Sequence, residues 1–464
     1  MKKALVTAAV LMLSFLGRGN AQPPGGAAGP HDQAVVLEKV ADIIERQYVL
    51  AEKAGGLADA FRAKCASGAY NALKDDKDFA AAVSADLVAI TGDKHMNFRV
   101  AEPSDIGETS VSPLRHPVRY ARLRARENTG LTRLEMIEPG IGLLELRRFY
   151  SFDQAKDMAL AAMTFLGAAN AIIIDVRENG GGSGDYLSSF FLPYPTQLSG
   201  LYTRADDTLT ETWTRRDIGK EPRTDVPLFI LTGPHTFSAA ESFAYDMQSR
   251  KRATLVGEPT KGGAHSVDLF KVGDRFELSV STGRAVSPVT GGNWEGTGVL
   301  PDVPAPAASA LEEALPLARK AAENYAKAEQ TRIREAVDGM QADLDRAEAL
   351  FKENEAAEAE AALDSLFLKA RSAGLLTEFF VGVFAYEFRS GENDAMLLAI
   401  LKKGLESFPL SSDLAEYSAY TCYQRGKKGL ALRYFRKALE LNPDSRTAAL
   451  MIERLDERPG PDGD

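Results

Sequence analysis

AIIIDVRENGGG, residues 171–182, is the stretch of this sequence that decides the fold. It opens with a continuous apolar run, Ala171 to Val176, which is typical of a parallel strand buried on both faces. The glycines that follow allow the backbone to approach a ligand at the carboxyl edge of a sheet. A simple tight turn is the alternative interpretation. A nucleotide site is not indicated, because the sequence has neither the phosphate-loop pattern nor a full Gly-x-Gly-x-x-Gly.

Strands and helices alternate on both sides of this stretch, which predicts α/β layering. A second buried strand is expected at 226–231, and the helix after it contains residues 244–247. The other elements expected here are a strand at 141–146, a helix at 152–166, and strands at 252–257 and 275–281.

Helical patterns flank this α/β region. Apolar residues recur at helical spacing from Ala34 to about Ile90, and this segment ends at Gly92-Asp93-Lys94-His95. Beyond Pro306 a period of 34 residues is visible. It appears in three sets of positions: Phe367, Leu401 and Phe435; Ala370, Gly404 and Ala438; and Pro409 with Pro443. A 34-residue period of helix pairs resembles tetratricopeptide repeats, which build a concave surface for peptides or partners. An incidental helical bundle is the alternative.

The N-terminus predicts export. Lys2 and Lys3 precede an apolar segment at 4–16, and small residues end at Ala21, where we place cleavage of a signal peptide. The apolar segment of about 13 residues is shorter than the ~20 that span a membrane, so we expect no stable span after cleavage. The predicted location is periplasmic or extracellular. A net charge of −10 and a pI of about 5.3 argue against a nucleic-acid partner.

Ser238 is the first candidate for chemistry. The strand at 226–231 leads through Thr236-Phe237 to this serine, where a helix begins, so its hydroxyl lies near free backbone N–H groups. The alternative is structural, because Ser238 and Glu241 also form a capping box.

A serine nucleophile needs a base, and the sequence offers five histidines: His31, His95, His116, His235 and His265. His31 falls in a Pro/Gly-rich leader and His116 beside a proline, so neither is attractive. An isolated histidine is more often a surface or core residue. Glu295, between Trp294 and Gly296, is a carboxylate that can orient an imidazole, or simply a solvated turn residue.

Taken in order, these segments resemble the tail-specific (C-terminal processing) peptidase superfamily over roughly residues 85–305. The motifs that carry the resemblance are Asp175-x-Arg177-x-Asn179-x-Gly181-Gly182, Thr236-x-Ser238-Ala-Ala-Glu241, Gly257-Glu258-x-Thr260, and Trp294-Glu295-Gly296-x-Gly298-Val299-x-Pro301-Asp302. The resemblance implies a crotonase-like ββα core and Ser238 as nucleophile.

Two departures separate this chain from the processing peptidases. Their Ser–Lys pair places the lysine where this sequence has Gly263, and Lys261 lies two residues early. Their PDZ domain has no room in the roughly 45 residues between His95 and Ile141.

The branch of the tricorn core and the interphotoreceptor retinoid-binding protein is more similar. Tricorn-like enzymes use Ser, His and Glu, which this resemblance carries onto Ser238 as nucleophile, His95 as general base and Glu295 as the group that orients the imidazole. It implies backbone oxyanion donors at Gly181 or Gly182 and at Ala239. The reserve candidates are His265, Glu241 and Lys261.

We therefore expect an exported serine endopeptidase that forms an acyl-enzyme on unfolded or carboxyl-terminal peptide segments. We expect neither metal nor organic cofactor, and the repeats would bind substrate or a protein partner. The alternative is a weakly active or inactive module that binds a hydrophobic small ligand. The expected parts are a signal peptide (1–21), a flexible leader (22–33), a helical domain (34–100), a connecting segment (101–140), a peptidase core (141–305), a helical linker (306–340), helical repeats (341–455) and a disordered tail (456–464).

Overall fold

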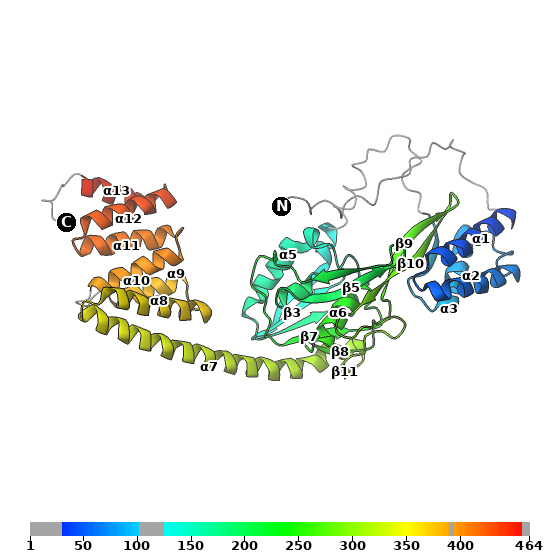
Figure 1. Cartoon of the computed structure of the whole chain (residues 1–464), viewed down its shortest axis with the longest axis horizontal. Helices are drawn as coiled ribbons and strands as arrows, with labels where there is room; N and C mark the ends of the chain where they lie inside the picture. The colour runs from blue at the N-terminus through cyan, green and yellow to red at the C-terminus, as the bar shows by residue number, and fades with distance from the viewer. Residues whose placement is uncertain (1–29, 102–124, 389–393, 457–464) are drawn as a thin grey trace. The chain divides into compact units, whose positions relative to one another are not determined.

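The computed structural model describes residues 30–101, 125–388 and 394–456 (Figure 1). The chain divides into two compact units, Met1–Ala322 and Glu323–Asp464. The expected signal peptide, most of the expected leader, nearly all of the expected tail and His116 lie outside the described residues.

A six-stranded sheet forms the centre of the first unit, in the order β11-β8-β7-β4-β3-β2. The stretch that decides the fold supplies β4, whose residues Ala171–Asp175 are all buried. Only β2, at one edge, is antiparallel to its neighbour. The bounds are β2 Leu131–Glu138, β3 Ile141–Leu146, β4 Ala171–Asp175, β7 Leu228–Thr232, β8 Thr254–Gly257 and β11 Val303–Pro304. The expected mixed α/β core is confirmed.

One face of this sheet packs against the beginning of helix α7 (Ala310–Lys352). Ala310, Ala314 and Ala318 lie on one side of that helix and are fully buried against Ile173 and Leu231. Small side chains at this spacing let the helix approach the strands closely. Helices α5 (Phe152–Phe165) and α6 (Ala239–Ser249) also belong to the core and follow β3 and β7 respectively.

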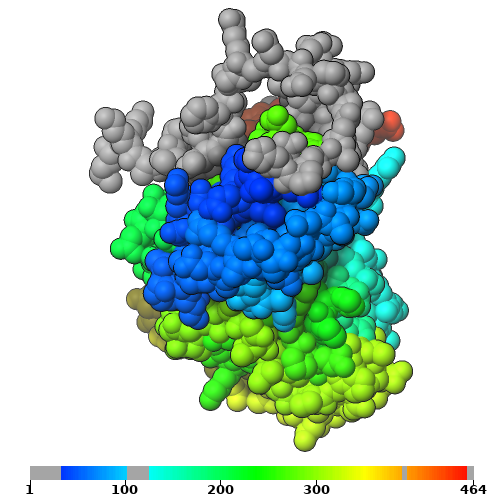
Figure 2. Space-filling view, turned by 90° about the vertical axis from the view of Figure 1, so that its right-hand side faces the viewer, coloured from blue at the N-terminus to red at the C-terminus, as the bar shows by residue number. Residues whose placement is uncertain are grey.

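A second sheet connects the core to the N-terminal helices. Its order is β1-β10-β5-β6, and β9 pairs with β10 as a hairpin. Helices α1 (Pro30–Gln47), α2 (Ala51–Ala66) and α3 (Asp76–Thr91) pack at the far end of this hairpin (Figure 1), and Figure 2 shows them in blue. The strand bounds are β1 Asn97–Val100, β5 Gln197–Thr203, β6 Thr208–Trp213, β9 His265–Val272 and β10 Phe276–Val286.

The N-terminal helices share a hydrophobic core with the hairpin. Phe79 of α3 packs against Phe98 of β1 and Phe276 of β10, with ring centroids 5.9 and 5.5 Å away. All three rings are buried. The expected helical domain therefore depends on strands that come about 180 residues later in the chain, and its residues near His95 are held against the α/β core.

Three boundaries differ in detail from the expected parts. Helix α1 begins at Pro30, four residues before the pattern used for the expectation. Strand β2 lies in the expected connecting segment but belongs to the central sheet. Helix α7 continues through residue 340 without a break, where a linker was expected to give way to repeats.

The second unit is built from helix pairs that follow the 34-residue period. Phe367, Leu401 and Phe435 are buried at equivalent places in α8, α10 and α12, the first helix of each pair. Gly404 lies where α10 approaches α9 so closely that a Cβ would be 2.4 Å from Val381. The bounds are α8 Ala356–Ser372, α9 Glu378–Glu387, α10 Asp394–Ser407, α11 Ser412–Gln424, α12 Lys428–Leu441 and α13 Arg446–Asp456. Within the described ranges, no helix has both the length and the apolar character needed to cross a membrane.

Candidate active site

The glycine loop (residues 176–182) and the serine loop (residues 233–238) lie together at the carboxyl edge of the parallel strands. Strands β4 and β7 are paired, so the segments that follow them leave the sheet side by side. Two hydrogen bonds join these segments: Thr236 Oγ1 donates to Val176 O at 2.8 Å, and Phe237 N donates to Asn179 O at 2.9 Å. This pairing places Ser238 beside the glycines.

Ser238 has an unusual backbone conformation, with φ 55° and ψ −118°. A positive φ is unfavourable for a residue with a side chain and is maintained only where the surroundings impose it. Ser238 also caps helix α6, since its N–H donates to Glu241 Oε2 at 2.8 Å. The helix cap and the strand-to-helix turn, which the sequence presented as alternatives, are therefore both present.

The glycines fit tightly around this turn. A Cβ on Gly181 would be 2.7 Å from Ser238 Cβ, and a Cβ on Gly182 would be 1.9 Å from Phe149 O. The Gly181 N–H donates to Asn179 Oδ1 at 2.8 Å and so is already used. The N–H groups of Gly182 and Ala239 have no hydrogen-bond partner among the described residues. Of the two expected glycine donors, Gly182 is therefore the one with a free N–H.

Beside Ser238 lies a cavity of ≈ 220 Å³. Its lining combines small polar residues such as Ser199 and Ser242 with His265 and with the apolar Leu201 and Trp294. Asp185 also lines it. Its carboxylate accepts hydrogen bonds from the Ser188 N–H at 3.2 Å and from the Ser188 hydroxyl. Burial raises the pKa of Asp185 to about 7. Sequence reasoning missed this residue, whose one signal is its position three residues after Gly182.

His95 stacks on Phe237, the residue before Ser238, with ring centroids 4.3 Å apart. Its side chain is only 9% exposed, and its Nδ1 is buried without a hydrogen-bond partner. Burial lowers the pKa of His95 to about 4, so the ring is neutral near pH 7.

Gly263 provides the space for this histidine. A Cβ at this position would lie 2.5 Å from His95 Cε1 and 2.1 Å from Phe237 Cε2. The two rings therefore fill the volume that a lysine side chain at position 263 would need. The absence of a lysine, noted in the sequence, has this steric explanation.

Glu295 does not orient His95 in this structure, contrary to the expectation. Its Oε2 accepts the Ala264 N–H at 2.6 Å and lies 3.7 Å from His265 Nδ1. Its Oε1 is buried without a partner. The carboxylate within 4 Å of His95 Nδ1 is that of Asp93, at 3.9 Å. His95 therefore lies near Asp93, and Glu295 lies near His265, instead of the two being paired with each other.

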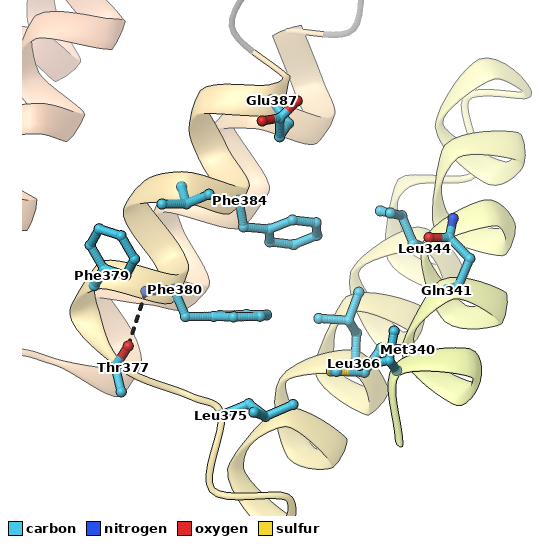
Figure 3. A pocket seen from close by; sticks show the side chains of 12 residues that line it. Met340, Gln341, Leu344, Leu366, Leu375, Thr377, Phe379, Phe380, Phe384 and Glu387 are labelled. Atoms are coloured by element: carbon cyan, nitrogen blue, oxygen red, sulfur yellow. Dashed lines mark hydrogen bonds between the residues drawn. The ribbon is translucent and has the colours of Figure 1, made fainter. Parts of the chain in front are cut away.

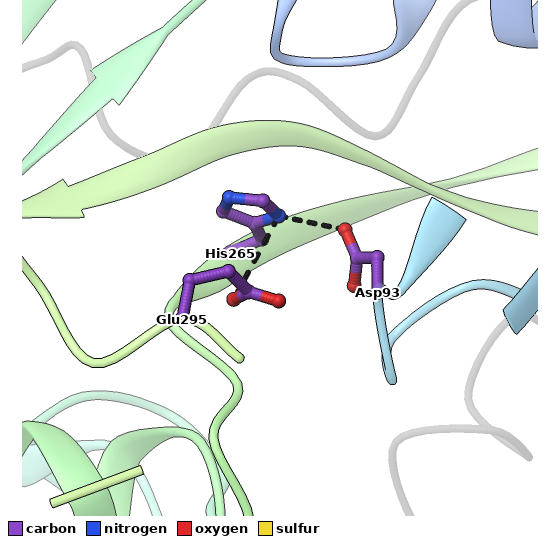
Figure 4. Close-up of side chains that lie close together, drawn as sticks. All are labelled: Asp93, His265 and Glu295. Carbon is purple, nitrogen blue, oxygen red and sulfur yellow. Dashed lines mark hydrogen bonds and ion pairs between the residues drawn. The ribbon is translucent and has the colours of Figure 1, made fainter. Parts of the chain in front are cut away.

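Asp93 joins the two histidines. Its Oδ1 accepts the backbone N–H of His95 at 2.9 Å, and its Oδ2 is 2.6 Å from His265 Nδ1 (Figure 4). Burial is the largest single effect and acts to raise the pKa of Asp93, but the hydrogen bond with His265, the charge of His265 and the backbone hydrogen bond from His95 together outweigh it, so the pKa is lowered. Asp93 is 1% exposed. The one sequence signal for Asp93 is its place two residues before His95.

The other reserve candidates, Glu241 and Lys261, make contacts that hold the fold together. Glu241 is fully buried and accepts four hydrogen bonds, from the N–H groups of Ser238, Gly262 and Gly263 and from the Thr260 hydroxyl. Its oxygens therefore have no free lone pair for a proton-transfer role. Lys261 places its Nζ 4.6 Å from the ring centroid of Phe237, as a cation–π contact.

Family profiles assign this arrangement to the peptidases. The profile described as Peptidase family S41 matches residues 140–305, which hold the glycine loop, Ser238 and Glu295. The profile of the N-terminal domain of these peptidases in eukaryotic IRBP matches residues 31–125, which hold His95. Residues 31–305 thus match the catalytic and N-terminal domains of peptidase family S41.

The relatives that match are processing peptidases. Carboxyl-terminal-processing peptidase 2 of Arabidopsis thaliana chloroplasts is 30% identical over 174 residues, covering 36% of this chain and 32% of that protein. The carboxyl-terminal-processing protease of Synechocystis sp. is 32% identical over 161 residues, covering 33% of this chain and 36% of that protein. The chain thus spans about a third of the length of these relatives. A lipoprotein structure from Streptococcus agalactiae has a TM-score of 0.45 at 16% identity, covering 65% of this chain and 98% of that one.

Substitution of Gly263 should disturb the site through its steric contacts. We expect Gly263→Ala to displace the rings of His95 and Phe237, to cost about 1–3 kcal/mol of stability, and to lower kcat/KM for a peptide substrate by about 10²-fold. Gly292→Ala is the matched control, because a Cβ there would meet nothing closer than Thr290 Oγ1 at 3.9 Å. Thermal melting and peptide hydrolysis measure the two effects. Wild-type values for both in Gly263→Ala would contradict this account of the site.

Proposed function

We propose that this protein is an exported serine endopeptidase with Ser238 as its nucleophile. The observation that carries the proposal is the strained turn at Ser238, which has two free backbone N–H groups beside it and directly follows Phe237, the residue on which the buried His95 ring stacks. A serine hydroxyl needs both a proton acceptor and an oxyanion site, and these surroundings support the proposal by offering a candidate for each. Peptide or unfolded protein segments are the proposed substrates.

His95 is the proposed general base. In acylation, the Ser238 oxygen bonds to the scissile carbonyl carbon while its proton passes to a ring nitrogen of His95. The N–H groups of Gly182 and Ala239 donate to the oxyanion. Collapse of the intermediate breaks the C–N bond, and the departing amine takes the proton from the imidazolium. Water then attacks the acyl-enzyme by the same steps and frees Ser238.

His265 remains the reserve base. It lines the cavity with Ser238, and Asp93 fixes its Nδ1, which leaves Nε2 for another partner. The alternative of a module for hydrophobic ligands has less support, because the cavity of ≈ 220 Å³ beside Ser238 is smaller than the roughly 300–1,000 Å³ of typical small-ligand sites.

An active-site serine probe tests the nucleophile. A fluorophosphonate should label the wild-type chain, whereas Ser238→Ala should show no label and a loss of peptide hydrolysis of at least about 10³-fold. Ser372→Ala, at an exposed position of α8, should be labelled like the wild type. Equal hydrolysis of a broad peptide library by Ser238→Ala and wild type would exclude the proposal.

The pH profile tests the base. Because burial lowers the pKa of His95 to about 4, the base stays unprotonated until the pH falls to that value. The acidic limb of kcat/KM should therefore lie near pH 4, with a tenfold loss per unit below it, and His95→Gln should remove most activity across the range. An acidic limb near 6.5, the ordinary value for histidine, would argue that this buried ring is not the base.

We further propose that the helical unit recruits the substrate. An apolar groove of ≈ 470 Å³ lies between α7, α8 and α9 (Figure 3). Phe380 and Phe384 point from α9 across the groove toward Leu344 and Leu366. Phe379, also in the lining, is 80% exposed. Exposed aromatic groups that line an apolar groove suit apolar side chains of an unfolded polypeptide.

A charge placed at the groove should weaken the binding of long substrates but not of short ones. Phe379→Glu should raise KM for an unfolded protein by about tenfold, since one aromatic contact contributes about 1.5–3 kcal/mol, and should leave KM for a short peptide unchanged. Leu410→Glu is the control, because Leu410 is 82% exposed in the same unit but outside the groove. Equal changes of KM for both substrates, or for both variants, would argue against recruitment by the groove.

A further inference from the structure

Asp93, His265 and Glu295 form a cluster with the geometry of a metal site. Each offers one ligand atom, and these atoms lie within 4.8 Å of one another. The residues come from three parts of the chain: the turn after α3, the start of β9 and the loop after β10. Figure 4 shows both carboxylates directed toward the same ring nitrogen, Nδ1 of His265.

The charges of this cluster are not balanced by protein cations. One imidazole nitrogen faces two carboxylates, but only Asp93 is at hydrogen-bond distance, and Glu295 remains 3.7 Å away. Glu295 Oε1 is buried without a partner. Among the described residues, no lysine or arginine forms an ion pair with either carboxylate. Burying two carboxylates around one imidazole is costly, and a divalent cation would offset that cost.

We propose that this cluster binds Zn²⁺, and that the bound ion inhibits the peptidase. One imidazole nitrogen and two carboxylate oxygens are ligands that Zn²⁺ accepts, with a water molecule as the fourth. On binding, the proton shared between His265 Nδ1 and Asp93 leaves to solvent, and the metal takes its place.

Backbone amides already orient both carboxylates. The His95 N–H fixes Asp93 Oδ1 at 2.9 Å, and the Ala264 N–H fixes Glu295 Oε2 at 2.6 Å. The Tyr48 hydroxyl donates to Asp93 Oδ2 at 3.3 Å. Hydrogen bonds of this kind hold metal ligands in place and strengthen binding. Since Asp93 also contacts His95, a metal on Asp93 would change the surroundings of the proposed base. This inhibitory effect rests on the proposed function, whereas binding does not.

Calorimetric titration of Zn²⁺ into the EDTA-treated full-length chain tests binding. Every variant in this titration also carries Ser238→Ala, so that autolysis cannot interfere. We expect one Zn²⁺ per chain, and binding at least about tenfold weaker in Glu295→Gln and in His265→Gln. His235→Gln, which changes an exposed histidine, should bind like the parent. Mg²⁺ should not bind, because it prefers an all-oxygen octahedral shell.

The outcomes test zinc binding, zinc inhibition and the proposed peptidase function separately. Equal Zn²⁺ affinity in all variants, or no binding at millimolar Zn²⁺, would overturn the site. Circular dichroism and thermal melting show whether each variant keeps its fold. If His265→Gln unfolds, the test of the site rests on Glu295→Gln, which keeps the shape of the side chain. In the active chain, Zn²⁺ should inhibit peptide hydrolysis and EDTA should restore it. Binding without inhibition would remove the regulatory role, and an inactive chain that still binds Zn²⁺ would count against the proposed function alone.

Discussion

The carboxylate of Glu241 holds the loops of the candidate site together. It is fully buried, and its four hydrogen bonds connect the turn at Ser238 with Thr260, Gly262 and Gly263. Burial raises the pKa of Glu241, and the donors act against that shift by stabilising the charged form. The strained conformation of the serine, the space for the His95 ring and the position of the glycines at 262–263 all depend on these bonds. Two other buried polar groups, Asn179 and Thr236, fix the glycine loop to the sheet in the same way.

Local sequence was sufficient to predict many of the strands and helices and the turn that holds Ser238. The apolar runs of β4 and β7 and the turn at Ser238 depend on residues that are neighbours in the chain. The 34-residue period also corresponds to real helix pairs. Strand β2 was not assigned to the sheet because it is a half-exposed edge strand without an apolar run. The identity of the repeats as tetratricopeptides stays a prediction.

The pairing of charged side chains was beyond local sequence. Asp93 and His265 are 172 residues apart, and nothing in either segment specifies the contact. Two imidazoles and two carboxylates meet in this region, and spacing along the chain cannot say which nitrogen faces which oxygen. Packing determines which histidine contacts which carboxylate. The His95 ring stacks on Phe237, and His265, at the start of β9, lies beside Asp93. Glu295 then lies with the second histidine.

The shared core of α3, β1 and β10 has a consequence for synthesis of the chain. The N-terminal helices emerge from the ribosome long before the β9–β10 hairpin whose aromatic rings they need. His95 therefore has no fixed place until the ribosome has passed residue 280, after Ser238 has also been made. A nascent or truncated chain would hold a serine without its proposed proton acceptor. Under the proposed function, proteolytic competence would thus arise only when the whole α/β unit has folded.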